Sequence, residues 1–354
     1  MTSMGDDWLG LARGIEGLEG VGLDAGLVRR FQSAGAALPP LTFHLPAFKH
    51  YSSPELPSCG GSAWPAVSIT GAECALNCDH CRAEILKPML PATTPEALWQ
   101  TANRLAERGA GGMLLTGGSD RRNEVGYGPF LATLRRIKDR FPHFRIAAHA
   151  GLVDRSAARG LADSGVDIAM LDVIGAQDTL ARVYHLKRPV ADFEASLAHL
   201  AATGMRVVPH VVLGLHYGQL LGEWRALEMI APCAPAAVVL VVVMPFYASP
   251  ARPFAVPSGR EVGHFFLDAR RALPGIPLQL GCARPAGRAK AEIDAYGVMA
   301  GLGGIAHPAE GAVELARKIG RELRLSPGCC SLGAGEPLDA VPGRPFPVKV
   351  VAHG

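Results

Sequence analysis

Strand-like and helix-like segments alternate through most of this sequence, and the alternation limits the folds that the chain can adopt. Short apolar runs are separated by longer segments in which apolar residues have helical spacing. Several of the runs are apolar at almost every position, which is typical of strands with both faces buried in a parallel sheet. The strand-like runs lie at 66–69, 112–116, 144–149, 167–172, 206–213, 237–244, 277–280 and 304–306.

The number of these runs predicts the architecture. Strands joined by helices pair in parallel through right-handed crossovers. Eight of them predict an α/β fold with a (β/α)8 barrel of the TIM type. Because the last two runs are short, a partial (β/α)6 barrel with N- and C-terminal extensions is the alternative. We expect an N-terminal helical and loop extension at 1–64, the barrel at 65–320 and a C-terminal cysteine-containing tail at 321–354.

The composition argues against several classes of partner. The 354 residues carry a net charge of only +3 and 6% aromatic residues, and no basic run is interleaved with aromatics, so no nucleic acid is expected. The longest apolar run, residues 236–244, is about half of the roughly 20 residues that span a bilayer, and the first residues lack a secretion signal. We expect a cytoplasmic protein without a membrane contact, whose eight cysteines serve metal or redox chemistry.

Three cysteines follow the first strand-like run with the spacing C-x3-C-x2-C. They are Cys74, Cys78 and Cys81. Thiolates this close together on one loop can occupy three corners of a cubane iron–sulfur cluster, and the missing fourth ligand leaves one iron open for a small molecule. The alternatives are a zinc knuckle and a set of inert buried thiols. Zinc is disfavoured because no second C-x2-C or H-x3-H pair follows nearby.

Residues 68–81, followed by the Leu-Lys-Pro-Met run at 86–89, resemble the signature of the radical S-adenosylmethionine (SAM) enzymes. More closely, they are similar to the two-component type of lipoyl synthase and to its relatives near biotin synthase. The resemblance implies a [4Fe–4S] cluster whose open iron binds the amino and carboxylate groups of SAM, and cleavage of SAM to a 5′-deoxyadenosyl radical. No catalytic side chain is assigned, because the radical derives from SAM.

Five further residues are candidates for binding SAM. Gly117, Gly118 and Ser119 follow the second strand and resemble the Gly-Gly-Glu motif whose backbone holds the SAM amino group, although Ser119 replaces the acid. A plain turn is the alternative. The resemblance places the backbone of His80 against adenine. Asp172 ends the fourth strand, where it can accept a hydrogen bond from a ribose hydroxyl or the methionyl amine, or simply face solvent.

The remaining cysteines bear on the reaction class. Cys282 follows the seventh strand, Cys329 and Cys330 follow the last helical segment, and Cys59 lies in the N-terminal extension. Together they supply enough thiolates for a second [4Fe–4S] cluster facing the first. The alternative is that they are buried small residues, since adjacent cysteines rarely bind one metal together without strain. We expect Cys233 to be structural.

The resemblance implies a lipoyl synthase component that inserts sulfur into a protein-bound octanoyl chain. It implies three partners: an octanoylated lipoyl-domain or glycine-cleavage H-type protein, a second radical SAM subunit, and an electron donor such as ferredoxin or flavodoxin. The N-terminal C-x4-C-x5-C motif of single-chain lipoyl synthases is missing. Two alternatives stay open: a radical SAM enzyme of another class, such as a mutase, methylase or cofactor-biosynthesis enzyme, and a non-catalytic iron–sulfur protein.

Overall fold

The computed structural model describes residues 7–34, 38–46, 51, 53–56 and 64–332. Its strands form one sheet with the order β11-β1-β10-β9-β8-β7-β6-β5-β4-β2-β3, and every pairing is parallel. The strands are β1 (Leu41–His44), β2 (Ala66–Ser68), β3 (Leu90–Pro91), β4 (Gly112–Thr116), β5 (Arg145–His149), β6 (Ile168–Asp172), β7 (Arg206–Leu213), β8 (Val238–Val242), β9 (Leu278–Leu280), β10 (Gly304–Ala306) and β11 (Leu323–Ser326).

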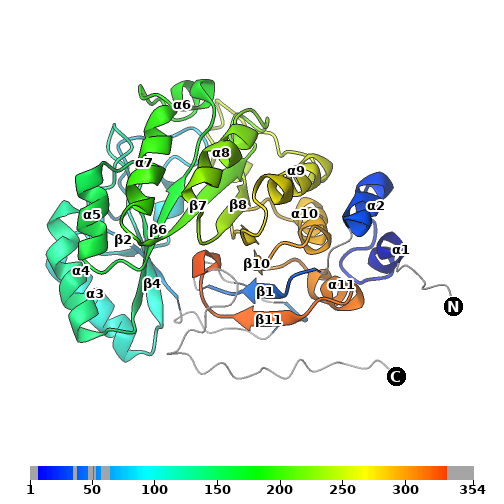
Figure 1. The fold of residues 1–354 in the computed structure, drawn as a ribbon, viewed down its shortest axis with the longest axis horizontal. Helices are drawn as coiled ribbons and strands as arrows, with labels where there is room; N and C mark the ends of the chain where they lie inside the picture. Colours follow the sequence, from blue (N-terminus) through cyan, green and yellow to red (C-terminus); the bar gives the residue numbers. More distant parts are fainter. Residues whose placement is uncertain (1–6, 35–37, 47–50, 52, 57–63, 333–354) are drawn as a thin grey trace.

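Helices connect the strands and cover the outer side of the sheet (Figure 1). Helix α3 shows why these segments are helical: Thr94 accepts a hydrogen bond from the backbone of Ala97, proline follows at the first position, and the buried residues recur on one face. The helices are α1 (Trp8–Arg13), α2 (Ala25–Ser33), α3 (Pro95–Glu107), α4 (Leu131–Arg140), α5 (Arg155–Asp163), α6 (Gln177–Arg182), α7 (Ala191–Ala201), α8 (Glu223–Ile230), α9 (Gly259–Ala272), α10 (Arg288–Met299) and α11 (Ala312–Lys318).

The predicted α/β class with parallel strands is confirmed, and each of the eight predicted runs contains a strand. The sheet is open, as in the partial-barrel alternative, since β3 and β11 form its two edges. The described strands therefore do not form a closed eight-stranded barrel. Strand β11 and helix α11 were not expected from the sequence.

Both extensions contribute strands to the sheet. β1 lies between β10 and β11, with Thr42 opposite Gly304 and Leu41 opposite Leu323. Figure 1 shows β1 and β11 side by side, at the edge of the sheet next to β10. The division into domains at 64 and 320 stays a prediction, but strands from outside 65–320 complete the inner surface.

The chain after β11 enters the concave side of the sheet. The 3-10 turn η5 (Cys330–Leu332) packs with Met170, Val208 and Val239, which point inward from β6, β7 and β8. Arg206, at the start of β7, donates a hydrogen bond to the carbonyl oxygen of Leu332 at 3.2 Å. This segment therefore lines the inside of the half-barrel. Among the described residues, no helix is both long enough and apolar enough to cross a bilayer.

Candidate active site

The three-cysteine loop follows β2 and turns sharply around its cysteines. Asn77, Arg82 and Ala83 have positive φ angles of 45°, 47° and 60°. Asparagine tolerates this left-handed conformation, whereas for alanine it costs about 1–2 kcal/mol. One turn lies just before Cys78 and the other just after Cys81. Cys74, Cys78 and Cys81 all line one cavity on the inner side of the sheet.

The turn after β4 holds this loop in place. A Cβ atom on Gly118 would lie 1.9 Å from the carbonyl oxygen of Glu73 and 2.6 Å from the Cα atom of Cys74. The amide of Gly118 donates to Thr70 Oγ1 at 2.7 Å, and the carbonyl oxygen of Ser119 accepts from the amide of Ala75 at 2.9 Å. The glycine thus permits close packing on the cysteine loop, a role that the sequence did not indicate.

The loop also favours thiolate formation. A hydrogen bond from the Cys78 thiol holds the pKa of Cys81 well below its ordinary value, despite the opposing effect of burial. The same interaction raises the pKa of Cys78. A thiolate is the form that binds iron, so the arrangement of the two sulfurs suits metal binding.

The cavity has a volume of about 300 Å³ and lies on the inner side of the sheet. It brings together every predicted site residue that the structure describes; Cys59 lies outside the described residues. Their functional roles stay predictions. The predicted residues on its wall are Cys74, Cys78, His80, Cys81, Gly117, Gly118, Ser119, Asp172, Cys282, Cys329 and Cys330.

Comparison with known proteins identifies part of the chain. Residues 68–226 match the model of the Radical SAM superfamily. This segment is similar to the domains of that superfamily. It contains the three-cysteine loop, the turn after β4 and Asp172, so the resemblance seen in the sequence is confirmed at the level of the superfamily. A [4Fe–4S] cluster and SAM are the cofactors that this family implies.

Solved structures share the fold over most of the chain. Methylornithine synthase (PylB) superposes with a TM-score of 0.53 at 14% identity, covering 86% of this chain and 82% of that one. HydG, a maturase of the [FeFe]-hydrogenase, gives 0.53 at 14% identity, covering 90% and 74%. At this identity the likeness shows the fold alone. No curated protein matches the sequence significantly.

His80 and Tyr184 lie together on the cavity wall. Their ring centroids are 5.2 Å apart with the planes tilted by 34°. Tyr184 is 4% exposed, and among the described residues its hydroxyl has no hydrogen-bond partner. A buried hydroxyl without a partner is costly, so this group indicates a ligand or a water in the cavity.

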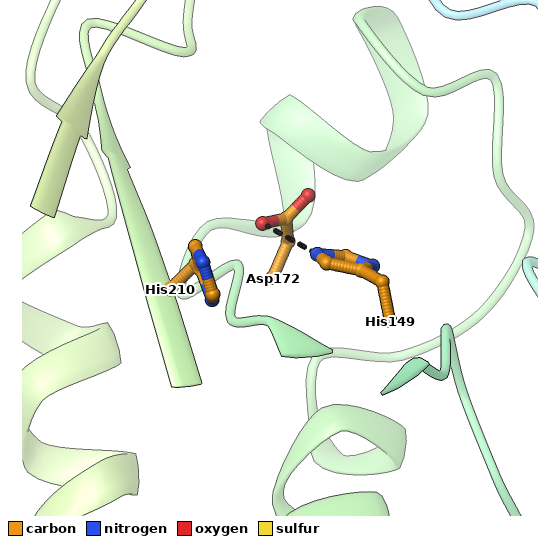
Figure 2. Close-up of side chains that lie close together, drawn as sticks. All are labelled: His149, Asp172 and His210. Carbon is orange, nitrogen blue, oxygen red and sulfur yellow. Dashed lines mark ion pairs between the residues drawn. The ribbon is translucent and has the colours of Figure 1, made fainter. Parts of the chain in front are cut away.

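Two histidines join Asp172 at the same wall. His149 ends β5, Asp172 ends β6, and His210 lies directly opposite Asp172 on β7. Figure 2 shows the three side chains facing one another. Sequence reasoning gave neither histidine a role, although both lie on predicted strands and His149 ends one of them.

Burial and mutual interaction shift the pKa values of this group in different directions. Burial raises the pKa of Asp172, but the nearby charge of His149 outweighs it and lowers the pKa to about 2. Burial lowers the pKa of His149, and Asp172 reverses this, so that it is raised. Burial, followed by the charge of His149, lowers the pKa of His210 to about 4. Asp172 is therefore ionised and His210 neutral at pH 7.

The later cysteines meet on another part of the cavity wall. Cys282 follows β9, while Cys329 and Cys330 follow β11. Cys330 lies close enough to Cys282 for the Cys282 thiol to contribute to the raised pKa of Cys330. A hydrogen bond from the Cys330 thiol lowers the pKa of Cys329 to about 6, so that Cys329 is mainly a thiolate at pH 7. Cys233, in the 3-10 turn η3 (Ala231–Cys233), is not part of this wall.

Asp79 lies within the cysteine loop and ties it to three neighbouring loops. Its carboxylate accepts hydrogen bonds from Arg252 at 2.8 Å, His185 at 2.9 Å and Tyr217 at 2.8 Å. Its carbonyl oxygen accepts from the amide of Ser249 at 3.1 Å. Burial raises the pKa of Asp79, but these three side chains lower it overall. The loops after α6, β7 and β8 are thereby fixed over the cysteine loop.

We expect Asp79→Asn to loosen the loop after β8. The variant removes the charge that Arg252 and His185 contact, and bonds to charged groups contribute about 1.5–3 kcal/mol when buried and less at exposed arginines. Amide hydrogen exchange at Ser249 should accelerate by about tenfold. The exposed Asp139 serves as the control through Asp139→Asn. Unchanged exchange at Ser249 would show that the carboxylate does not hold the loop.

Proposed function

We propose that this protein is a radical SAM enzyme that inserts sulfur into an unactivated alkyl chain, as a component of the two-component lipoyl synthase type. One observation supports it above all: the three cysteines of the loop and a second group, Cys282, Cys329 and Cys330, line the same cavity. A sulfur-inserting enzyme needs a radical source and a sulfur source within reach of one substrate.

The described residues fit the first cluster and SAM. Three thiols converge, and the loop supplies no fourth protein ligand. A [4Fe–4S] cluster with SAM, when bound there, supplies a 5′-deoxyadenosyl radical. The carbonyl oxygens of Gly117 and Gly118 are the backbone acceptors left at the turn after β4, since the Gly118 amide and the Ser119 carbonyl are used within the protein.

Other residues of the wall would orient SAM. Asp172 is ionised and lines the cavity, so one of its oxygens can accept a hydrogen bond from a ribose hydroxyl or the methionyl amine. His80 borders the same space, with Tyr184 beside it. These groups hold the ligand in one orientation, which is the contribution that a protein makes to radical chemistry.

The second cysteine group fits an iron–sulfur cluster as a sulfur source. Cys282 and Cys330 interact, and Cys329 is mainly a thiolate. A [4Fe–4S] cluster bound there supplies sulfide to the substrate. Three described thiols leave the fourth ligand to another group, for which Cys59, outside the described residues, is the candidate from the sequence.

The remaining wall suits an alkyl chain. Leu114, Met170, Val212, Val241 and Met244 present apolar surface to the cavity. Such a wall binds methylene groups and excludes water from a reactive radical. We propose an octanoyl group on a lipoyl-domain or glycine-cleavage H-type protein as the substrate, a second radical SAM subunit that shares the two insertions, and ferredoxin or flavodoxin as the electron donor.

Iron and labile sulfide per chain, measured after anaerobic reconstitution, test this proposal. We expect about eight irons in the wild type and about four in a Cys74→Ala, Cys78→Ala, Cys81→Ala variant, because each [4Fe–4S] cluster holds four. A Cys282→Ala, Cys329→Ala, Cys330→Ala variant should also keep about four irons. Cys233→Ala, outside the cavity wall, is the control and should keep about eight.

The outcomes separate the alternatives. About four irons in the wild type and none in the loop variant would rule out the second cluster and leave a radical SAM enzyme of another class. Absence of methionine and 5′-deoxyadenosine after reduction with SAM would indicate an iron–sulfur protein without catalysis.

A further inference from the structure

We infer that His149, Asp172 and His210 form a binding site for a divalent first-row transition-metal ion, separate from both cysteine groups. One ligand atom from each residue lies within 4.8 Å of the other two. Two imidazoles and one carboxylate are the donor set of many mononuclear iron and zinc sites. The inference goes beyond the proposed function and does not depend on the second cluster.

The sheet fixes the three side chains on one side. Asp172 and His210 are direct partners in the parallel register of β6 and β7, and His149 pairs with Met170, two residues before Asp172. The three residues come from adjacent strands and project from the inner face into the cavity (Figure 2). Side chains on strands are held more rigidly than side chains on loops, which favours a defined coordination geometry.

The distance between His149 and Asp172 suits a shared metal better than a direct hydrogen bond. His149 Nε2 lies 3.4 Å from Asp172 Oδ1, beyond the usual 2.7–3.2 Å of an N–H···O bond. Two ligands that are each about 2.0–2.1 Å from one metal lie about 3–3.4 Å apart at octahedral to tetrahedral angles.

His210 already has the hydrogen bond that a ligating histidine requires. Its Nδ1 donates to the carbonyl oxygen of Val208 at 3.1 Å. With the proton on Nδ1, the lone pair of Nε2 is available to a metal. Donation of the other ring N–H to a carbonyl group is the usual second contact of a metal-bound imidazole, because it fixes the tautomer and the ring orientation.

Three protein ligands leave open positions that face the cavity. A metal ion there would bind an anionic oxygen or sulfur group of the substrate, and the unpartnered hydroxyl of the buried Tyr184 lies on the same wall. The carboxylate of Asp172 has two oxygens, so Oδ1 can bind the metal while Oδ2 accepts a hydrogen bond from SAM. Asp172 would therefore bind the metal ion in addition to its predicted hydrogen bond with SAM.

Cobalt(II) binding to the reconstituted full-length protein, with its clusters oxidised, tests the inference. Equilibrium dialysis counts bound cobalt, and pulsed electron paramagnetic resonance detects imidazole nitrogen next to it. We expect about one such cobalt per chain in the wild type. His149→Ala, Asp172→Asn and His210→Ala should each weaken binding by about tenfold or more, since even loss of an outer contact costs about 10–100-fold. The exposed His143, changed to alanine, is the matched control.

Either of two results would overturn the inference. The wild type would bind no nitrogen-coordinated cobalt, or the His149, Asp172 and His210 variants would all bind cobalt as tightly as the wild type. Cobalt with sulfur ligands alone would also overturn it, because the ion would then occupy cysteines. Iron content is measured on the same samples. About four irons with the cobalt site intact would disprove the second cluster alone, and about eight irons without the cobalt site would disprove this inference alone.

Discussion

Gly118→Ala is expected to lower SAM cleavage by about tenfold or more. The new Cβ atom would lie 1.9 Å from the backbone oxygen of Glu73 and 2.7 Å from the Cβ atom of Cys74, so the cysteine loop must move. Overpacking of this kind costs about 1–3 kcal/mol, and about 1.4 kcal/mol corresponds to a factor of ten. The measurements are iron bound per chain and the formation of methionine and 5′-deoxyadenosine under reduction.

Gly126→Ala is the matched control, because no atom lies within 4 Å of the position that its Cβ would take. It should retain the activity of the wild type. If Gly118→Ala also kept full activity and iron, the packing of the turn after β4 on the cysteine loop would not position Cys74.

Arg284→Met is expected to reduce the free energy of unfolding by about 3–5 kcal/mol, the usual cost of removing one partner of a buried ion pair. Arg284 Nε lies 2.7 Å from Asp294 Oδ1, and both side chains are 0% exposed. Nη2 of Arg284 also donates to the carbonyl oxygen of Ala306 at 2.7 Å. The pair therefore ties the segment that carries Cys282 to α10 and β10. Denaturant unfolding of the cluster-free protein measures the change.

Two further variants test the cause of that loss. Arg288→Met, at an exposed position four residues later, should change the stability by less than about 0.5 kcal/mol. Arg284→Met combined with Asp294→Leu should recover much of the loss, because the buried carboxylate is removed together with Arg284. Lys290, which contacts Asp294 Oδ2 at 3.1 Å, is partly exposed and keeps its hydrogen bond to the carbonyl oxygen of His307. A small effect of Arg284→Met alone would contradict a structural role for the pair.

The cysteine spacing and the alternation of strands with helices are local features, so the sequence by itself determined them. C-x3-C-x2-C needs only one short loop, and it identified Cys74, Cys78 and Cys81 correctly as neighbours. Continuous apolar runs predicted the strands because they are also local features. A strand with both faces buried is apolar at nearly every position, whichever strands it pairs with. Gly117, Gly118 and Asp172 followed because residues after parallel strands share one end of a sheet.

The tertiary structure alone decided how distant segments meet. β1 and β11 pair with each other although about 280 residues separate them, and no periodicity within either strand reports its partner. Cys329 and Cys330 reach the cavity because the chain after β11 turns into the concave side. His149 and His210 became a site together with Asp172 only through the parallel register of β5, β6 and β7. Pairing and register depend on contacts between strands, which the sequence of one strand does not contain.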